Sequence, residues 1–149
     1  MKEIKLTQGK VALVDDEDFD YLNQFKWHAS KSRKTFYASR GKNPAIKMHR
    51  FIMKTKEGLQ VDHIDHNGLN NQKNNLRNCT IHQNNMNKGM GEKEYMRGIY
   101  KAKNRFRSII TLNYKSYSIG FFKTEEEAAR AYDQKAKEMF GEFANLNFK

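Results

Sequence analysis

The segment Lys88–Met96 divides the chain into two parts with different sequence patterns. It contains Gly89 and Gly91 and shows no apolar periodicity, which is typical of a linker. Before it, short apolar runs alternate with turns; after it, three alternating runs precede one helical run. The hydrophobic share of 38% is also low, since about 45–50% is usual for a globular domain. The sequence therefore predicts a modular α+β protein with several small cores.

The basic residues lie in two long runs that contain no acid. Ten Lys and Arg residues fall between Lys26 and Lys56, six more lie between Tyr95 and Ile119, and the formal net charge of the chain is +11. A single basic run is usually a solvated face, but these two are interleaved with aromatic residues. This combination favours a nucleic-acid partner.

Short elements are expected in the first part of the chain. Two strands at Ile4–Leu6 and Lys10–Val14 precede a short helix that Asp15 and Asp16 would cap. A hairpin of Lys26–Ala29 and Thr35–Arg40 follows, and Ile46–Met53 reads as a strand end that leads into a helix.

The stretch from Val61 to Leu69 combines an acid, histidines and a turn. The expected elements are a strand at Leu59–Ile64, a turn at Asn67–Asn75, a strand at Leu76–Cys79, and a helix from Ile81 to about Lys88 capped by Thr80. Asp62 and Asn84 could then supply two oxygen ligands to a hard cation such as Mg²⁺. His63 could accept a proton from an attacking water. The alternative is a structural Asp-His pair followed by ordinary turns.

These residues and their spacing resemble the HNH motif of phage and bacterial homing endonucleases. The resemblance covers Val61–Leu69, Asn74–Arg77 and Gln83–Asn85, and Met48–Met53 resembles the segment that precedes the motif. It implies a ββα-metal fold and a metal-dependent DNA endonuclease. His63 would be the general base, Asp62 and Asn84 the metal ligands, and Asn75 a brace for the loop. Asparagine at the third position argues for Mg²⁺ or Mn²⁺ over Zn²⁺.

Other residues near the motif have simpler interpretations. His66 is expected in an exposed turn, and His82 on the solvent-facing side of a helix. His49 could contact the site or a phosphate; the alternative is that it has no such contact. Cys79, the single cysteine, is interpreted as a small buried residue.

The second part of the chain predicts three strands and a helix. The strands are Gly98–Lys103, Arg105–Leu112 and Lys115–Phe121, and a capping box at Thr124 opens a helix that ends near Gly141. Residues 95–148 resemble the DNA-binding domain of plant ERF-type factors. This resemblance implies a sheet laid in the major groove with the helix behind it.

Alternation sorts the sheet residues into two faces. Phe106, Ser108, Ile110 and Leu112 should face the helix. The residues expected to face DNA are Tyr100, Lys103, Arg105, Arg107, Ile109, Thr111, Ser116 and Ser118. Several of these differ from the plant pattern, so its base preference does not carry over.

Together, these patterns and resemblances predict a nicking homing endonuclease with four segments. They are an N-terminal basic α+β region (1–57), the HNH motif (58–88), a linker (89–96) and the ERF-type domain (97–149). The expected partner is double-stranded DNA, with one Mg²⁺ or Mn²⁺ per chain, no membrane association, and a monomer or weak dimer in the cytoplasm of a bacterial host. The alternatives are a non-catalytic DNA-binding regulator with a decayed nuclease module and, less favoured, an RNA-binding protein.

Overall fold

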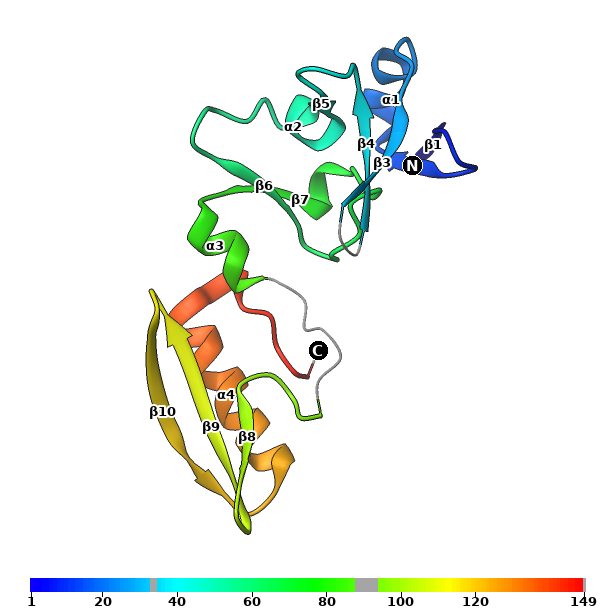
Figure 1. Ribbon diagram of the computed structural model, residues 1–149. Helices are drawn as coiled ribbons and strands as arrows, with labels where there is room; N and C mark the ends of the chain where they lie inside the picture. The colour runs from blue at the N-terminus through cyan, green and yellow to red at the C-terminus, as the bar shows by residue number, and fades with distance from the viewer. Residues whose placement is uncertain (33–34, 88–93, 149) are drawn as a thin grey trace. The chain divides into compact units, whose positions relative to one another are not determined.

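A computed structural model describes residues 1–32, 35–87 and 94–148 of the chain (Figure 1). The chain forms two compact units, Met1–Asn84 and Asn85–Lys149. Both combine small antiparallel sheets with helices, as an α+β chain should. The expected division into four segments is drawn at a finer level and stays a prediction.

The first unit begins with a hairpin and a short helix. Strands β1 (Lys2–Lys5) and β2 (Val11–Val14) pair antiparallel, and the turn between them has positive φ at Gln8 and Gly9. Helix α1 (Asp16–Leu22) follows. The predicted strands and helix are therefore present. Their apolar side chains help to form a core whose buried members are Ile4, Ala12, Val14, Leu22, Trp27, Ala38 and Met48.

A second small sheet completes this core. It has the order β3–β4–β5, with β3 at His28–Ser32, β4 at Thr35–Arg40 and β5 at Ile46–Lys47. The third strand leads directly into helix α2 (Met48–Ile52), as predicted. Residues 33 and 34 of the expected hairpin loop lie outside the described residues.

Several side chains of the first basic run serve the fold. The Arg40 guanidinium lies 3.9 Å from the centre of the Phe25 ring and 4.6 Å from that of Phe51. Lys47 Nζ donates to Ser39 Oγ at 2.9 Å, and Arg50 Nη1 donates to the Leu59 carbonyl at 2.8 Å. These contacts stabilise unit 1 through cation–π attraction and hydrogen bonds. Not every positive charge of the run is therefore directed at a partner.

Two strands and a helix follow in the order expected for the central stretch. Strand β6 (Gln60–His63) pairs antiparallel with β7 (Leu76–Cys79), and α3 (Ile81–Met86) comes next. Thr80 caps this helix, because its Oγ1 accepts from the Gln83 amide at 3.2 Å while Gln83 Oε1 accepts from the Thr80 amide at 2.8 Å. This reciprocal pair is a capping box.

The connection between β6 and β7 is fastened to the N-terminal hairpin. The amide of Leu13 donates to the Leu69 carbonyl at 2.9 Å, and the amide of Asn71 donates to the Leu13 carbonyl at 2.8 Å. Asp15 adds a side-chain contact, since its Oδ2 accepts from the Lys73 amide at 2.8 Å. Asp15 stands at the N-cap position of α1 but makes no side-chain capping bond. The prediction that its carboxylate caps α1 was therefore wrong, because the loop uses that carboxylate.

Gly68 lets the same connection lie close against β4. A Cβ atom at this position would lie 2.5 Å from the Phe36 carbonyl oxygen and 2.6 Å from Tyr37 Cε1. The Gly68 amide donates to Thr35 Oγ1 at 3.1 Å. Only a residue without a side chain fits this approach.

The second unit is a three-stranded sheet covered by one long helix. The order is β10–β9–β8, with β8 at Ile99–Ala102, β9 at Arg105–Leu112 and β10 at Lys115–Phe122. Helix α4 (Glu125–Phe140) opens with the predicted capping box of Thr124 and Glu127, and Gly141 is its C-cap. The buried core consists of Ile99, Ile110, Ala128, Ala129, Tyr132 and Ala136.

A buried acid holds the C-terminal segment against α4. Asp133 is only 7% exposed, and its two carboxylate oxygens accept from the Asn147 amide at 2.8 Å and the Phe148 amide at 2.9 Å. The short helix η2 (Gly141–Phe143) makes the turn. Tyr95 and Met96, the last residues of the predicted linker, pack on the core of this unit. Residues 88–93 of that linker lie outside the described residues.

Among the described helices, none is both long and apolar enough to cross a membrane.

Candidate functional site

Strand β6 carries the central acid and histidine on opposite faces. Asp62 and His63 are adjacent in the strand, and adjacent strand residues point to opposite sides. Both are buried, at 5% and 6% exposure. The structure therefore gives each side chain its own set of neighbours, and His63 is the last residue of the strand.

Asp62 forms a buried ion pair with Arg77 across the β6–β7 ladder. The two residues are register partners, and Arg77 Nε and Nη2 donate to Asp62 Oδ2 at 2.9 and 2.7 Å. The side chains are 11% and 6% exposed for Arg77 and Asp62. Such a pair compensates for the loss of hydration that each charge suffers on burial. Arg77 thus fixes the orientation of the carboxylate.

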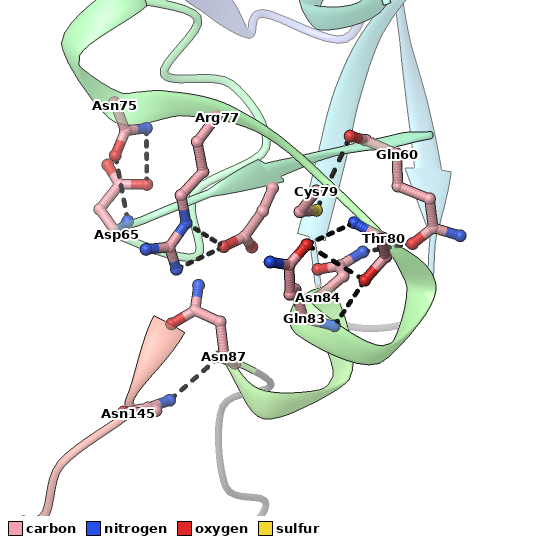
Figure 2. A network of polar contacts seen from close by, with 11 residues as sticks. Gln60, Asp65, Asn75, Arg77, Cys79, Thr80, Gln83, Asn84, Asn87 and Asn145 are labelled. Carbon is pink, nitrogen blue, oxygen red and sulfur yellow. Dashed lines mark hydrogen bonds and ion pairs between the residues drawn. The ribbon is translucent and has the colours of Figure 1, made fainter. Parts of the chain in front are cut away.

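Asn84 lies on the same side of β6 as Asp62. Its Nδ2 donates to Gln60 Oε1 at 2.6 Å (Figure 2), and Gln60 stands two residues before Asp62 on the strand. Residues two apart share a face and are separated by about 7 Å along the strand. Helix α3 and strand β6 therefore bring the two predicted oxygen ligands to one side.

This pair of residues has the chemistry that a hard cation requires. A carboxylate and an amide oxygen suit Mg²⁺ or Mn²⁺, which keep several waters and use few protein ligands. Within the described ranges, no group of three or more His, Cys, Asp and Glu side chains gathers at a potential metal site. In their chemistry, Asp62 and Asn84 are therefore suited to supply two oxygen ligands to such a cation.

His63 packs against two rings on the other side of the strand. Its ring centre lies 4.9 Å from that of His49 on α2, in an edge-to-face arrangement, and 5.7 Å from that of Tyr37 on β4. Tyr37 and His49 also contact each other, at 5.3 Å. The three rings, from three different elements, form one packed aromatic group, so His63 has a defined position.

Burial keeps these groups neutral. It lowers the pKa of His63 below its ordinary range, although the negative charge of Asp65 acts in the opposite direction. Burial, reinforced by repulsion from His63, lowers the pKa of His49 to about 3. Burial and the charge of Asp62 raise the pKa of the Tyr37 hydroxyl. At neutral pH, His63 is therefore an uncharged imidazole that can accept a proton.

Asn75 holds the loop that follows β6. Its Oδ1 accepts from the Asp65 amide at 3.0 Å, and its Nδ2 donates to Asp65 Oδ1 at 2.9 Å (Figure 2) and to the Asn70 carbonyl at 2.9 Å. The Ile64 amide also donates to the Asn75 carbonyl, at 3.0 Å. These bonds fix the backbone directly after His63, the geometry that a loop brace requires.

The remaining histidines and the cysteine have modest surroundings. His66 and His82 are exposed. Cys79 is 2% exposed, and burial raises the pKa of its thiol, which donates to the Gln60 carbonyl at 3.7 Å. A buried thiol with a raised pKa is a poor nucleophile.

The sequence analysis included Arg77 in the motif but assigned no role to Arg77, Tyr37 or Gln60. The contact of Arg77 with Asp62 could have been predicted from the sequence, because pairing the two predicted strands around their loop places these residues opposite each other. The contacts of Tyr37 and Gln60 could not have been predicted in this way, because their partners lie on separate elements. His49 does contact the site, through His63.

The open face of the second unit carries the residues predicted to face DNA. Lys103 lies in the turn that follows β8 instead of at the end of the predicted strand. Ile109 is half-buried, and the others are exposed: Tyr100, Lys103, Arg105, Arg107, Thr111, Ser116 and Ser118. On the opposite face, Ser108 and Ile110 are fully buried. Polar contacts cross the open face: Arg107 Nε donates to Ser118 Oγ at 3.3 Å, and the hydroxyls of Thr111 and Ser116 lie 3.0 Å apart. The alternation of β9 is as predicted.

A curated relative aligns over nearly the whole chain. It is described as an uncharacterized HNH endonuclease, L560, of Acanthamoeba polyphaga mimivirus, and it is 35% identical over 147 residues, which cover 94% of this chain and 76% of the relative. The chain belongs to the HNH endonuclease family. No family model matches the sequence.

Arg77 offers a test of the buried ion pair. Replacing it with Met should lower the free energy of unfolding of unit 1 by about 3–5 kcal/mol, because the Asp62 carboxylate would remain buried without its charge partner. The double variant Asp62→Asn/Arg77→Met should recover part of this loss. The free energy of unfolding is measured by denaturant titration, followed by the fluorescence of Trp27, the single tryptophan of the chain. The control Lys2→Met breaks an exposed pair with Asp20 and should cost under about 1 kcal/mol; equal losses would contradict the assignment.

His49 gives unit 1 a pH-dependent stability. Its pKa is about 3 in the folded chain and about 6.5 when unfolded, so between these values the unfolded state binds more protons. Stability from this group is full above pH 6.5 and falls as the pH drops towards 3, by about 2 kcal/mol between pH 7 and pH 5. The variant His49→Met should show a decrease smaller by that amount over the same range. An unchanged decrease would show that His49 is not held neutral.

Proposed function

We propose that the protein is a metal-dependent DNA endonuclease that hydrolyses phosphodiester bonds and acts as a site-directed nicking homing enzyme. The observation that carries this proposal is the arrangement around β6. Two oxygen donors, Asp62 and Asn84, share one side of the strand, and a neutral imidazole, His63, stands at its end. Membership of the HNH endonuclease family supports the same reaction.

Each of these side chains has one role in the proposed reaction. Asp62 and Asn84 hold one Mg²⁺ or Mn²⁺, whose charge stabilises the negative charge that develops on the scissile phosphate. His63 takes a proton from the attacking water, for which a neutral ring is required. Asn75 keeps the backbone after His63 in place through its bonds to Asp65 and Asn70.

The surrounding residues position this machinery. Arg77 holds Oδ2 of Asp62 through two donors and so limits the directions that the carboxylate can offer to a cation. The rings of Tyr37 and His49 limit the rotation of His63. Defined positions are needed because the proton-accepting nitrogen must lie within hydrogen-bond reach of the water.

The open face of the second unit is the proposed DNA-binding surface. It presents Lys103, Arg105 and Arg107, and the segment from Tyr95 to Ile119 contains no acid. Arginine and lysine side chains on such a face neutralise backbone phosphates. Their guanidinium and ammonium groups also donate hydrogen bonds to base edges. In this proposal the sheet supplies an ERF-type binding domain, and unit 1 supplies the cutting site. One site per chain implies that a monomer nicks one strand.

One observation favours a second candidate, a DNA-binding regulator that does not cut. Asp62, the proposed metal ligand, is already engaged by Arg77. A carboxylate neutralised in this way binds a cation less readily than a free one. A plasmid assay with Mg²⁺, repeated with EDTA, separates the candidates, because the regulator would bind DNA and leave it intact under both conditions.

Removing the base should abolish cutting without removing binding. We expect His63→Ala to nick supercoiled plasmid about 10²–10⁴ times more slowly than the parent, the range for loss of a general base. Its affinity for the same DNA, measured by gel shift in EDTA, should stay within about twofold, since His63 is buried and does not supply charge to the DNA. The rate of open-circle formation is the measured quantity.

His82→Ala is the matched control, because His82 is exposed on α3. It should cut at the parental rate. Cutting by His63→Ala as fast as the parent with Mg²⁺ would overturn the assignment of the base.

A further inference from the structure

A bulge in β10 changes which residues that strand presents to the open face of unit 2. Ser116 pairs with Thr111 and Ser118 with Ile109, but the register then shifts between Ser118 and Gly120. Beyond the shift, Phe121 pairs with Arg107. Strict alternation from Ser116 and Ser118 would have placed Phe121 on the helix side. The extra residue of a bulge reverses that parity.

Burial confirms the change of face. Phe121 is 55% exposed, whereas its neighbours Ile119 and Phe122 pack against the core beneath the sheet. Phe121 belongs neither to the buried core of this unit nor to the partly buried residues that pack on it. The bulge thus interrupts the regular alternation of β10 and places the Phe121 ring on the open face.

Phe121 belongs to a row that crosses all three strands. Tyr100 on β8 and Phe121 on β10 are both register partners of Arg107 on β9. The Arg107 guanidinium lies 5.7 Å from the Phe121 ring centre, and its Nε donates to Ser118. The row therefore places a positioned cation between two exposed aromatic rings, Tyr100 being 53% exposed.

A hollow adjoins the Phe121 ring. It has a volume of about 540 Å³ and is lined by Ala102, Lys103, Asn104, Arg105 and Phe121. Its apolar part comes from Ala102 and the ring, and its charged part from Lys103 and Arg105. The lining thus offers apolar contact for a base edge and positive charge for nearby phosphates.

We propose that Phe121, with Ala102 beside it, contacts the 5-methyl group of a thymine in the major groove and so helps to set the sequence preference of the protein. This inference rests on the proposed binding of duplex DNA by the open face. The methyl group of thymine is the apolar feature of the major-groove edge, and phenylalanine is among the side chains that meet it. Arg107 supplies the neighbouring polar contact, to a base or to a phosphate.

The test removes the methyl group and nothing else. Preferred duplexes are first selected from a randomised library with the full-length protein in EDTA, which prevents cutting. Each thymine of the selected site is then replaced in turn by uracil. Binding of the parent should weaken by about fourfold at one or two positions, the factor that corresponds to one buried methyl group. It should be unchanged at the others.

Substitution of Phe121 completes the cycle. Phe121→Ala should bind the thymine and uracil duplexes equally well, with an affinity near that of the parent for the uracil duplex. The matched control Tyr117→Ala changes an aromatic residue of the same strand that is 47% exposed and pairs with Ile110 of the helix side. It should keep the fourfold preference.

Two results would overturn the proposal: a parent that binds every uracil duplex as tightly as the thymine duplex, or a Phe121→Ala variant that keeps the full preference. Circular dichroism and thermal unfolding of the variants check that the fold is intact, which is expected for an exposed side chain. Nicking of plasmid by the parent is measured separately. Failure to cut would contradict the proposed nuclease function and leave the thymine measurement valid.

Discussion

The buried ion pair between Asp62 and Arg77 is the constraint on which unit 1 depends. Both side chains are almost removed from water, so neither charge is tolerable without the other. The pair also fixes the register of β6 and β7, because a shift by one residue would turn Asp62 and Arg77 to opposite sides of the ladder. That register places His63 at the end of its strand and Asn75 directly before β7. The contacts of the loop with Leu13 and Asp15 then hold the connection between the strands.

The sequence predicted most of the elements but few of the contacts between them. Strand β7 was placed to the residue, and the capping residues Thr80 and Thr124 were identified, because these signals are local. The carboxylate of Asp15 was misassigned, since its partner Lys73 is 58 residues away. The group of Tyr37, His49 and His63 likewise unites three elements that are separate in sequence. Phe121 escaped the sorting by alternation because a bulge leaves no reliable mark in sequence.

The two units illustrate different uses of a small sheet. In unit 1, the candidate site residues of the β6–β7 sheet and the neighbouring His49 on α2 are buried, and burial sets their charge states: His49 and His63 are held neutral, and Asp62 keeps a partner. In unit 2, one face of the sheet packs on α4 and the other stays open with basic and aromatic side chains. Chemistry requires the first arrangement, since proton transfer depends on a defined charge state. The second arrangement, an open face with basic side chains, suits the recognition of a polyanion. This division of work is the one proposed for the whole protein.

The central claim is that Asp62 and Asn84 form a cation site that DNA completes. Titration with Mn²⁺, followed by electron paramagnetic resonance, tests it in a His63→Ala background so that the duplex stays intact. The free protein should bind Mn²⁺ weakly, and one ion per chain should bind at least about tenfold more tightly when duplex DNA is present. An added Asn84→Ala substitution should remove that gain. Equal affinity with and without DNA, or an unchanged gain after Asn84→Ala, would show that Asp62 and Asn84 do not form this cation site.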